Sequence, residues 1–164
     1  MPPFATCDLC DVHEADTSGR FRVVPPAFRD FGVARAFSGP VATLRSIEDN
    51  SRVREAVNSP GQGRVLVIDG GSSLRCALVG GNLAKAAAGN GWAGIVIDGA
   101  VRDLAELAAA GIPIKALALM PMRSTKRGEG QADIAISIQR VPVRPGDWLY
   151  ADEDGIVVSD RALT

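Results

Sequence analysis

Runs of apolar residues alternate with helix-like segments through the middle of the 164-residue chain. Three continuous apolar runs predict buried strands, at Arg64–Asp69, Gly94–Asp98 and Ile112–Leu119. Between them, an alanine-rich segment and a segment closed by a glycine predict helices, at Asn82–Asn90 and Asp103–Ala110. This alternation of strand and helix at short spacing favours a parallel sheet with right-handed crossovers.

Shorter elements are expected before this centre. We predict a helix over Cys7–Ala15 with Thr6 as its N-cap, because threonine is a favoured capping residue. Alternating and β-branched residues predict a strand over Gly39–Ile47. A second helix is predicted over Ser51–Asn58, with Asn50 as its cap.

The remaining segments are predicted to be loops and short strands. Asp16–Arg35 is rich in loop residues, and Leu74–Val79 is interpreted as a helical or turn segment. Pro121–Gly130 is a basic, glycine-containing loop. Turn signals separate three short strands in the C-terminal third, at Asp133–Gln139, Asp147–Ala151 and Gly155–Ser159. We therefore expect one compact α/β domain over residues 1–164, with a mixed and partly barrel-like sheet.

Composition excludes several classes of protein. Hydrophobic residues make up 46% and charged residues 23%, which is typical of a globular chain and excludes a disordered chain or a coiled coil. The formal net charge of −1 gives no electrostatic footprint for direct binding of nucleic acid. The apolar runs are too short for a transmembrane helix, and the first residues carry no secretion signal. We therefore expect a cytoplasmic protein with no membrane partner.

Two polar segments are expected at the same edge of the predicted sheet. The first precedes a helix and consists of Gly80, Gly81, Asn82 and Leu83. The second follows the second central strand and contains Arg102 and Asp103. Ligands of open α/β sheets gather at the carboxyl ends of the strands. There the helix N-terminus could hold a carboxylate, Arg102 could pair with it, and Asp103 could bind a hard divalent cation.

This combination suits a metal-chelating 2-oxo acid, but the same residues have a plainer interpretation. A Gly-Gly-Asn sequence before a helix can be only a turn and a cap, and an adjacent arginine and aspartate can be a cap and a surface charge. Asp69 and Asp98, which end buried strands, could likewise join a metal site or cap turns. The basic loop Arg123–Arg127 could be a solvated face, or it could guide an anionic substrate or a protein partner.

Cysteine and histidine give a weaker signal. Cys7 and Cys10 are spaced as a zinc or redox pair with His13 nearby, but a structural zinc site usually needs four ligands and Cys76 lies far along the chain. A half-buried helix turn is the alternative. The glycine-rich turns do not match the G-x-G-x-x-G or Walker patterns of nucleotide-binding proteins.

Five segments in one order resemble the RraA-like family, which contains regulators of ribonuclease E activity and class II 4-hydroxy-4-methyl-2-oxoglutarate aldolases. They are Thr6–Asp11, Phe31–Asn50, Gly63–Ala84, Gly91–Asp103 and Gly146–Ser159. The resemblance covers nearly the whole chain. It implies an α/β domain of the swivelling β/β/α type, assembled as a ring-shaped homotrimer that could pair into hexamers.

The resemblance also implies a metal-dependent lyase. In aldolase members, the loop matching Gly80–Leu83 and the arginine matching Arg102 hold the substrate, and the aspartate matching Asp103 holds Mg²⁺ or Mn²⁺. Such an enzyme cleaves 2-oxo acids of the 4-hydroxy-4-methyl-2-oxoglutarate type to pyruvate, with oxaloacetate decarboxylation as a side activity. Aldolase members often carry an aspartate about where Gly81 stands, and this chain does not. Decarboxylation needs no base on a hydroxyl group, so it should tolerate this difference better than the aldol reaction.

The family implies an alternative function as a non-catalytic protein that binds ribonuclease E and inhibits it. Asp103 favours the enzyme, because a pure binding protein needs no metal ligand beside Arg102. Gly81 favours the binding protein, because a catalytic carboxylate is missing there. Some family members are labelled methyltransferases, but this chain carries no motif for that cofactor.

Overall fold

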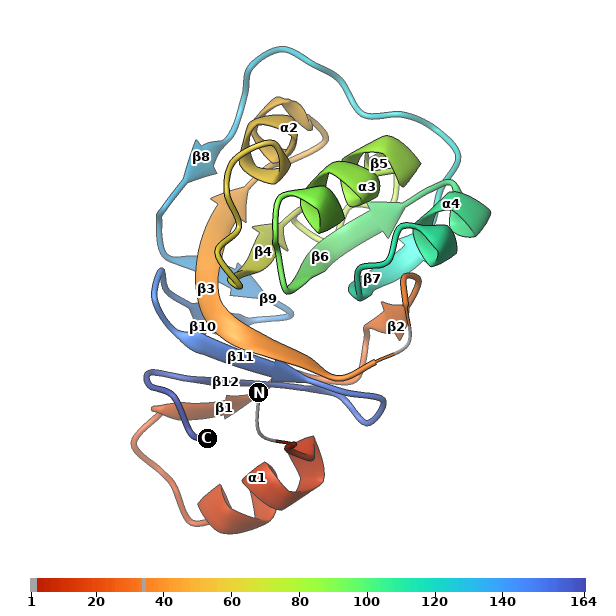
Figure 1. Ribbon diagram of the computed structural model, residues 1–164. Helices are drawn as coiled ribbons and strands as arrows, with labels where there is room; N and C mark the ends of the chain where they lie inside the picture. The colour runs from red at the N-terminus through yellow and green to blue at the C-terminus, as the bar shows by residue number, and fades with distance from the viewer. Residues whose placement is uncertain (1–2, 34) are drawn as a thin grey trace.

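A parallel sheet forms the centre of the computed structural model, which describes residues 3–33 and 35–164 (Figure 1). Its parallel strands lie in the order β3 (Phe37–Arg45), β4 (Val65–Asp69), β6 (Gly94–Val101) and β7 (Ile114–Leu119). The short strand β5 (Ala77–Val79) pairs in parallel with the C-terminal end of β6. The strands predicted from the three central apolar runs are thus confirmed.

Antiparallel strands extend this sheet on both sides and make it a mixed, curled sheet, as predicted. Beyond β3 follow β11 (Trp148–Ala151), β12 (Ile156–Ser159) and β1 (Phe21–Val23). Beyond β7 lies β2 (Arg29–Asp30), and β8 (Gln131–Ala132) pairs with the end of β3. A separate hairpin consists of β9 (Ile136–Ile138) and β10 (Val141–Val143).

Three helices cover one face of the parallel strands (Figure 1). They are α2 (Ser51–Val57), α3 (Gly81–Gly89) and α4 (Leu104–Ala109). The first helix, α1 (Thr6–His13), lies at the opposite end of the molecule, beside β1 and β12. Among the described residues, none of the helices is long and apolar enough to span a bilayer.

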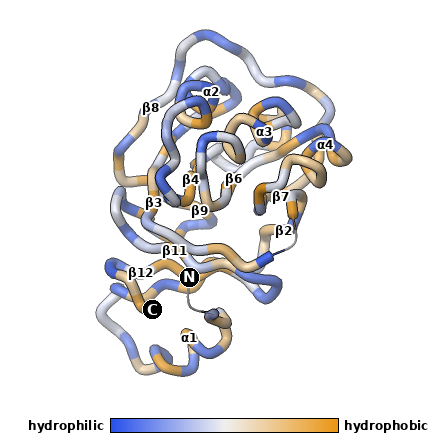
Figure 2. Tube along the Cα trace, in the orientation of Figure 1, coloured by the Kyte–Doolittle hydropathy of each residue, from blue (hydrophilic) through white to orange (hydrophobic). Residues whose placement is uncertain are grey.

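The central strands read as unbroken apolar runs because both faces of the sheet are buried. In β4, Leu66 and Ile68 pack under the helices, whereas Val65 and Val67 point to a second core beneath β11 and β12. All four side chains are at most 1% exposed. Figure 2 shows the resulting contrast between the apolar strands and the hydrophilic loop that runs from β7 to β8.

The interpretation of Leu74–Val79 as a helical or turn segment is wrong. Ala77–Val79 is instead the strand β5, whose backbone pairs with β6. The backbone N–H of Ala77 also donates a hydrogen bond to the carbonyl of Met122, at 2.8 Å. Both partners are distant in sequence, so local propensity gives no sign of them. Similarly, the predicted loop Asp16–Arg35 contains the short strands β1 and β2.

The two predicted helix caps also differ from the structure. Thr6 is the first residue of α1 rather than its cap, and its hydroxyl and backbone N–H both donate to the carboxylate of Asp152, at 2.6 and 2.7 Å. Asn50 precedes α2, but its side chain makes no capping bond. The carboxylate of Asp49 accepts the hydrogen bond from the N–H of Ser51 instead, at 2.9 Å.

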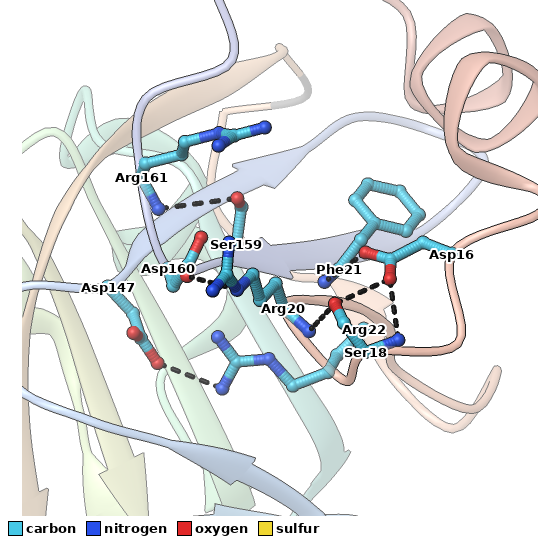
Figure 3. A network of polar contacts seen from close by, with 9 residues as sticks. All are labelled: Asp16, Ser18, Arg20, Phe21, Arg22, Asp147, Ser159, Asp160 and Arg161. Atoms are coloured by element: carbon cyan, nitrogen blue, oxygen red, sulfur yellow. Dashed lines mark hydrogen bonds and ion pairs between the residues drawn. The ribbon is translucent and has the colours of Figure 1, made fainter.

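A polar network fastens β1 to the C-terminal strands (Figure 3). Asp16 accepts hydrogen bonds from the backbone N–H groups of Ser18 and Phe21, at 2.7 and 3.1 Å, which fixes the turn before β1. Bonds from Ser18 and Phe21 lower the pKa of Asp16. The buried guanidinium of Arg22 lies 2.9 Å from the carboxylate of Asp147. The carboxylate of Asp16 is therefore matched by backbone donors, and the charge of Arg22 by that of Asp147.

Candidate functional site

The two polar segments predicted to share an edge of the sheet do meet there. Gly80 follows β5 and Arg102 follows β6, and these strands run parallel and side by side. The backbone N–H of Arg102 donates to the carbonyl of Val79, at 3.0 Å, which locks the two strand ends together. Carboxyl ends of adjacent parallel strands are the usual place for a ligand in this class of fold.

Asp103 holds its carboxylate against the start of α3. Its backbone is left-handed, with φ 65° and ψ 53°, a conformation that aspartate tolerates better than most residues. In this conformation Oδ2 accepts a hydrogen bond from the N–H of Gly81 at 3.0 Å and lies 4.0 Å from Nε of Arg102. The side chains of Arg102 and Asp103 are 40% and 39% exposed, so both remain open to a ligand.

Two glycines permit this close approach. A Cβ added at Gly80 would stand 2.6 Å from Oδ2 of Asp103, so a side chain there would displace the carboxylate. A Cβ added at Gly81 would collide with the side chain of Glu106, whose Oε2 is the atom nearest to it. Glu106 therefore occupies the space that an aspartate at position 81 would need.

Glu106 is a second carboxylate beside the glycine turn that the sequence prediction missed, and it lines a neighbouring hollow rather than the pocket of Arg102 and Asp103. It lies three residues after Asp103 in the first turn of α4, and residues at this spacing share one face of a helix. The carboxylates of Asp103 and Glu106 both contact Gly81 or its immediate surroundings. The D-x-x-E spacing was visible in the sequence, but only the fold shows that its second carboxylate returns to the glycine turn.

A pocket of about 120 Å³ opens beside Arg102 and Asp103. This volume is well below the roughly 300–1,000 Å³ of pockets for drug-sized ligands, so it suits a molecule of few atoms. The pocket is lined by Asn50, Arg54, Ala77, Gly80, Asn82, Leu83, Arg102, Asp103, Arg123, Ser124 and Lys126. Every residue of the predicted site except Gly81 lines it, and Gly81 forms the adjoining turn.

The pocket carries an excess of positive charge. Besides Arg102, its walls hold the cations of Arg54, Arg123 and Lys126, against the single carboxylate of Asp103. Within the described part of the chain, these three cations form no ion pair with a carboxylate. The basic loop that the sequence left between two interpretations thus contributes to the pocket.

Two buried polar atoms in the pocket wall lack a hydrogen-bond partner among the described residues. They are the hydroxyl of Ser124, a residue that is 5% exposed, and Oδ1 of Asn50. An unpaired buried polar atom costs about 1–3 kcal/mol unless a ligand or water satisfies it. The wall therefore offers hydrogen bonds to a polar ligand.

Asp49 fixes the basic loop over the pocket. Its fully buried carboxylate accepts hydrogen bonds from the backbone N–H groups of Ser51 and Arg127, at 2.9 and 2.6 Å. Burial alone would raise the pKa of Asp49, but hydrogen bonds from Ser51, Arg127 and Glu129 outweigh this effect and lower the pKa to about 2. A charged carboxylate thus ties the loop to the start of α2.

The donor set at this edge fits a hard divalent cation. Oδ1 of Asp103 makes no hydrogen bond to a described residue, so it is free to act as a ligand, and Glu106 stands nearby. No group of three or more His, Cys, Asp or Glu residues that could hold a metal occurs within residues 3–33 and 35–164. Mg²⁺ commonly uses one or two carboxylates and fills its other positions with water, so two carboxylates are sufficient.

The cysteine pair lies elsewhere, on α1, and gains no third ligand from the described residues. The negative charge of Asp154 raises the pKa of the Cys7 thiol, and burial raises that of Cys10. Both effects disfavour the thiolate, the form that binds metals and reacts with disulfides. The half-buried helix turn is the interpretation that the geometry supports.

Asp69 and Asp98, the other two aspartates at strand ends, accept hydrogen bonds from neighbouring loops. Asp69 accepts a hydrogen bond from the N–H of Gly71 at 2.9 Å and so closes the turn after β4. Asp98 is buried and accepts bonds from the hydroxyl of Ser72 and from the backbone and side chain of Gln139. Both aspartates hold loops in place.

A family model described as RraA-like, Aldolase/RraA, matches residues 6–158 of the chain. Among curated relatives, a protein of Albidiferax ferrireducens is 63% identical over 170 residues, covering 99% of this chain and 98% of the relative. A protein of Cupriavidus necator is 57% identical over 164 residues, with 99% of each chain covered. Both are named provisionally as 4-hydroxy-4-methyl-2-oxoglutarate aldolases.

Solved structures agree with the fold over nearly the whole chain. The RNA-processing inhibitor RraA of Thermus thermophilis superposes with a TM-score of 0.92 and 42% identity, covering 99% of this chain and 96% of that one. A protein of Geobacillus kaustophilus, described as an S-adenosylmethionine:2-dimethylmenaquinone methyltransferase, superposes with a TM-score of 0.89 and 41% identity, covering 98% and 97%.

Proposed function

The chain belongs to the RraA-like family, and we propose that it is a divalent-metal-dependent lyase. Its reaction is the retro-aldol cleavage of 2-oxo acids of the 4-hydroxy-4-methyl-2-oxoglutarate type to pyruvate, with oxaloacetate decarboxylation as a side activity. One observation carries this proposal: the carboxylate of Asp103 meets the N-terminus of α3 beside Arg102, in a pocket with excess positive charge. The names of the 63% and 57% identical relatives support the aldolase reaction.

Two carboxylates, from Asp103 and Glu106, would hold Mg²⁺ or Mn²⁺. When bound, the cation supplies a Lewis acid for the oxygen on which negative charge develops as the C–C bond breaks. Hydrogen bonding to the N–H of Gly81 fixes the orientation of Asp103, so the ligand oxygen is positioned before the cation arrives. Glu106 also supplies, from the next turn of the chain, a carboxylate near the position where aldolase members often carry an aspartate.

Arg102 and the first turn of α3 would hold the substrate carboxylate. N–H groups of Asn82 and Leu83 lie in that first turn, where a helix has no internal acceptor for them. The guanidinium of Arg102 adds paired donors and a full positive charge. Because these donors are fixed by the fold, they would also stabilise charge that develops on a neighbouring oxygen during the reaction.

Pyruvate release in the presence and absence of the cation tests the proposal. The purified protein is incubated with 4-hydroxy-4-methyl-2-oxoglutarate, or with oxaloacetate, in Mg²⁺ or in excess EDTA, and pyruvate is measured by coupled reduction. We expect release with Mg²⁺ and only the background rate with EDTA. Equal rates in the two conditions would refute the metal dependence, and no release in either would refute the lyase.

The alternative function, inhibition of ribonuclease E by direct contact, is favoured by one observation. The Thermus relative in the same fold, 42% identical, is described as an RNA-processing inhibitor. Because this chain has a net charge of −1, its partner in such a role would be the protein rather than the RNA. Titration of purified ribonuclease E with this protein, read out as RNA cleavage, separates this function from the lyase.

We also propose assembly into a homotrimer, which could pair into hexamers. Support comes from large apolar side chains that stay exposed at or just after the carboxyl ends of β6 and β7, namely Leu104, Leu119 and Met122. Exposed apolar groups gathered in one region usually mark an interface. Light scattering coupled to size-exclusion chromatography should give three or six times the chain mass of 17.1 kDa. A monomeric mass would contradict the assembly.

A further inference from the structure

We propose that a pocket beside α1 binds a small organic cation, a molecule with an apolar body and an ammonium group. This α1 pocket has a volume of about 350 Å³. Its walls come from α1, from the end of β1 and the residues that follow it, from β7, and from the hairpin of β11 and β12. It therefore lies beside α1, at the end of the molecule opposite to Arg102 and Asp103 (Figure 1).

The size and the apolar walls of the α1 pocket fit a small molecule. Pockets that bind small molecules have volumes of roughly 300–1,000 Å³ and walls that are mainly apolar. The apolar part of the wall includes Val23, Val24, Pro25, Pro26, Phe28 and Ile156. Val23 is 55% exposed, so apolar surface is left in contact with water here. The apolar body of a ligand would remove this surface from water, which favours binding.

Three carboxylates in the pocket wall have no cation as a partner. They belong to Asp11 on α1 and to Glu153 and Asp154 in the turn between β11 and β12, and none of them forms an ion pair with a described residue. Among the described residues that line the pocket, the only cation is Lys115, and the carboxylate of Asp30 at 3.1 Å balances its charge. The pocket therefore has an excess of negative charge that complements a cationic ligand.

The two cysteines of α1 report the same negative field. Cys7 and Cys10 both line the pocket, three residues apart on one face of the helix. The negative charge of Asp154 is the largest of the causes that raise the pKa of the Cys7 thiol, and the charge of Asp152 adds to it. Burial is the first cause that raises the pKa of Cys10, and the charges of Asp11 and Asp152 raise it further. A field that disfavours a thiolate in the pocket wall favours an ammonium group there.

Hydrogen bonds fix the walls of the α1 pocket to one another before a ligand arrives. The N–H and hydroxyl of Thr6 donate to the carboxylate of Asp152 at 2.7 and 2.6 Å, which ties α1 to the hairpin of β11 and β12. The ammonium group of Lys115 donates to the carbonyl of Asp152 and ties β7 to the same hairpin. The N–H of Val24 donates to the carbonyl of Ile156 at 3.0 Å. Because these elements are already joined, a ligand has less conformational entropy to offset on binding.

The negative charge also separates this pocket from the candidate site at the other end of the molecule. The carboxylates around the α1 pocket would repel a 2-oxo acid anion, whereas the cations around Arg102 would attract it. The inference therefore concerns a second class of ligand, and it does not depend on the proposed lyase function.

Binding of three probes to the purified protein tests the inference. 2-Phenylethylamine is a cation with an aromatic body, 2-phenylethanol has the same body without the charge, and ethylamine has the charge without the aromatic body. We expect isothermal titration calorimetry at low salt to show that both control probes bind at least about tenfold more weakly than 2-phenylethylamine. The alcohol lacks the ion pairs, and ethylamine lacks most of the apolar area that would be buried. The difference from the alcohol should shrink at high salt, because salt screens exposed charges.

Variants of exposed residues locate the probe. Glu153→Gln combined with Asp154→Asn removes two charges from the pocket wall, so it should weaken the binding of 2-phenylethylamine about tenfold and leave that of 2-phenylethanol unchanged. Asp8→Asn combined with Glu14→Gln is the matched control, because it removes two exposed charges that do not line the pocket. Val23→Trp fills the apolar space without a change of charge and should abolish the binding of both aromatic probes. Circular dichroism checks that each variant is folded.

Several outcomes would overturn the inference. Equal binding of 2-phenylethylamine and 2-phenylethanol would show that the pocket does not select a cation. Unchanged binding of 2-phenylethylamine in the Glu153/Asp154 variant or in Val23→Trp would mean that the probe binds elsewhere. No binding of any probe would also overturn it, and this is the result expected if a second copy of the chain covered the pocket.

Discussion

The two ends of the molecule differ in whether their cationic side chains are paired with opposite charges. Beside β1, the buried guanidinium of Arg22 lies 2.9 Å from the carboxylate of Asp147, and both side chains are less than 10% exposed (Figure 3). At the carboxyl edge of the parallel sheet, the cations of the pocket face only the carboxylate of Asp103. Paired charges of the first kind hold the fold together. Unpaired charges of the second kind are stable only if water solvates them or a ligand of opposite charge pairs with them.

The pockets at the two ends also differ, in the polarity of the groups that line them. A pocket of about 350 Å³ lies beside α1 and is lined largely by apolar groups such as Val24, Pro25 and Phe28. The one buried amine in its wall, on Lys115, already has the carboxylate of Asp30 at 3.1 Å. The pocket at the sheet edge is about a third as large, yet its wall holds the unpaired hydroxyl of Ser124 and the unpaired Oδ1 of Asn50. The candidate site is therefore distinguished by its unpaired cations and polar atoms rather than by its volume.

Removing the charge of Asp103 should give the largest effect. Asp103→Asn keeps a residue that tolerates the left-handed backbone, so it changes the ligand without straining the turn. We expect pyruvate release to fall at least about a thousandfold, because the Lewis acid supplies several kcal/mol. The matched control is Asp133→Asn, an exposed aspartate with φ 58° outside the site, which should keep full activity. Retained activity in Asp103→Asn would remove the catalytic distinction between the two ends.

Breaking the buried pair at the other end should act on stability instead. Asp147→Asn leaves the buried guanidinium of Arg22 without its counter-charge, which should cost about 3 kcal/mol in the free energy of unfolding. Urea denaturation measures the loss. Asp160→Asn is the control, because its partner Arg20 is exposed and a pair of this kind contributes at most about 1 kcal/mol. A similar loss of unfolding free energy in both variants would show that the contribution of an ion pair to stability does not depend on its burial in this protein.

Asp49 should link stability to pH. Its folded pKa of about 2 lies below the ordinary value of 3.8, so the charged form stabilises the fold. This contribution is complete above about pH 4 and is lost as the pH falls from about 4 to about 2. Asp49→Asn should destabilise the protein at neutral pH by about 1–3 kcal/mol and flatten the pH dependence in that window. Unfolding curves recorded from pH 2 to pH 7 test this. If the free energy of unfolding of the variant changed with pH as steeply as that of the unchanged protein, carboxylates other than Asp49 would be responsible for the pH dependence.

The smallest effect is expected at Glu106. Glu106→Gln keeps the shape of the side chain but removes its charge, so the affinity for Mn²⁺ should fall about tenfold if this carboxylate is the weaker of the two that hold the cation. Titration of Mn²⁺ followed by electron paramagnetic resonance measures this directly. Glu55→Gln, a carboxylate on the outer side of α2 paired with Arg52, is the control. Equal affinities in the Glu106 variant and the unchanged protein would exclude this residue from the metal site.

Elements buried on both faces could be predicted from the sequence, because burial on both faces requires a continuous run of apolar residues. Strands β4, β6 and β7 appear as apolar runs; the residues of β4 and β6 are nearly all buried, and the first three residues of β7 are buried as well. β5 could not be predicted in this way, because its three residues are too few to show a periodic pattern of apolar and polar positions. The same holds for β2 and β8, which have two residues each.

The candidate site was predictable where it consists of strand ends and not where it depends on distant contacts. Gly80, Arg102 and Asp103 follow directly from the edge of a parallel sheet. Ser124 and Lys126 line the pocket because their loop is held by distant residues, among them Asp49, more than seventy residues earlier, which accepts a hydrogen bond from the N–H of Arg127. Such a contact has no signature in a single sequence, so a basic loop could be interpreted only as a solvated face or a guide for anions.

The contact between Gly81 and Glu106 also restricts how this site can change in evolution or in a library. Any side chain introduced at position 81 would collide with Glu106, and not only with its flexible carboxylate, because an added Cβ would stand 2.5 Å from the Cβ of Glu106. Shortening position 106 to alanine therefore leaves the collision, and a carboxylate at position 81 needs either glycine at position 106 or a shift of α4 away from α3. Libraries that vary position 81, alone or together with alanine at position 106, should therefore contain few variants that keep the contact between the two helices.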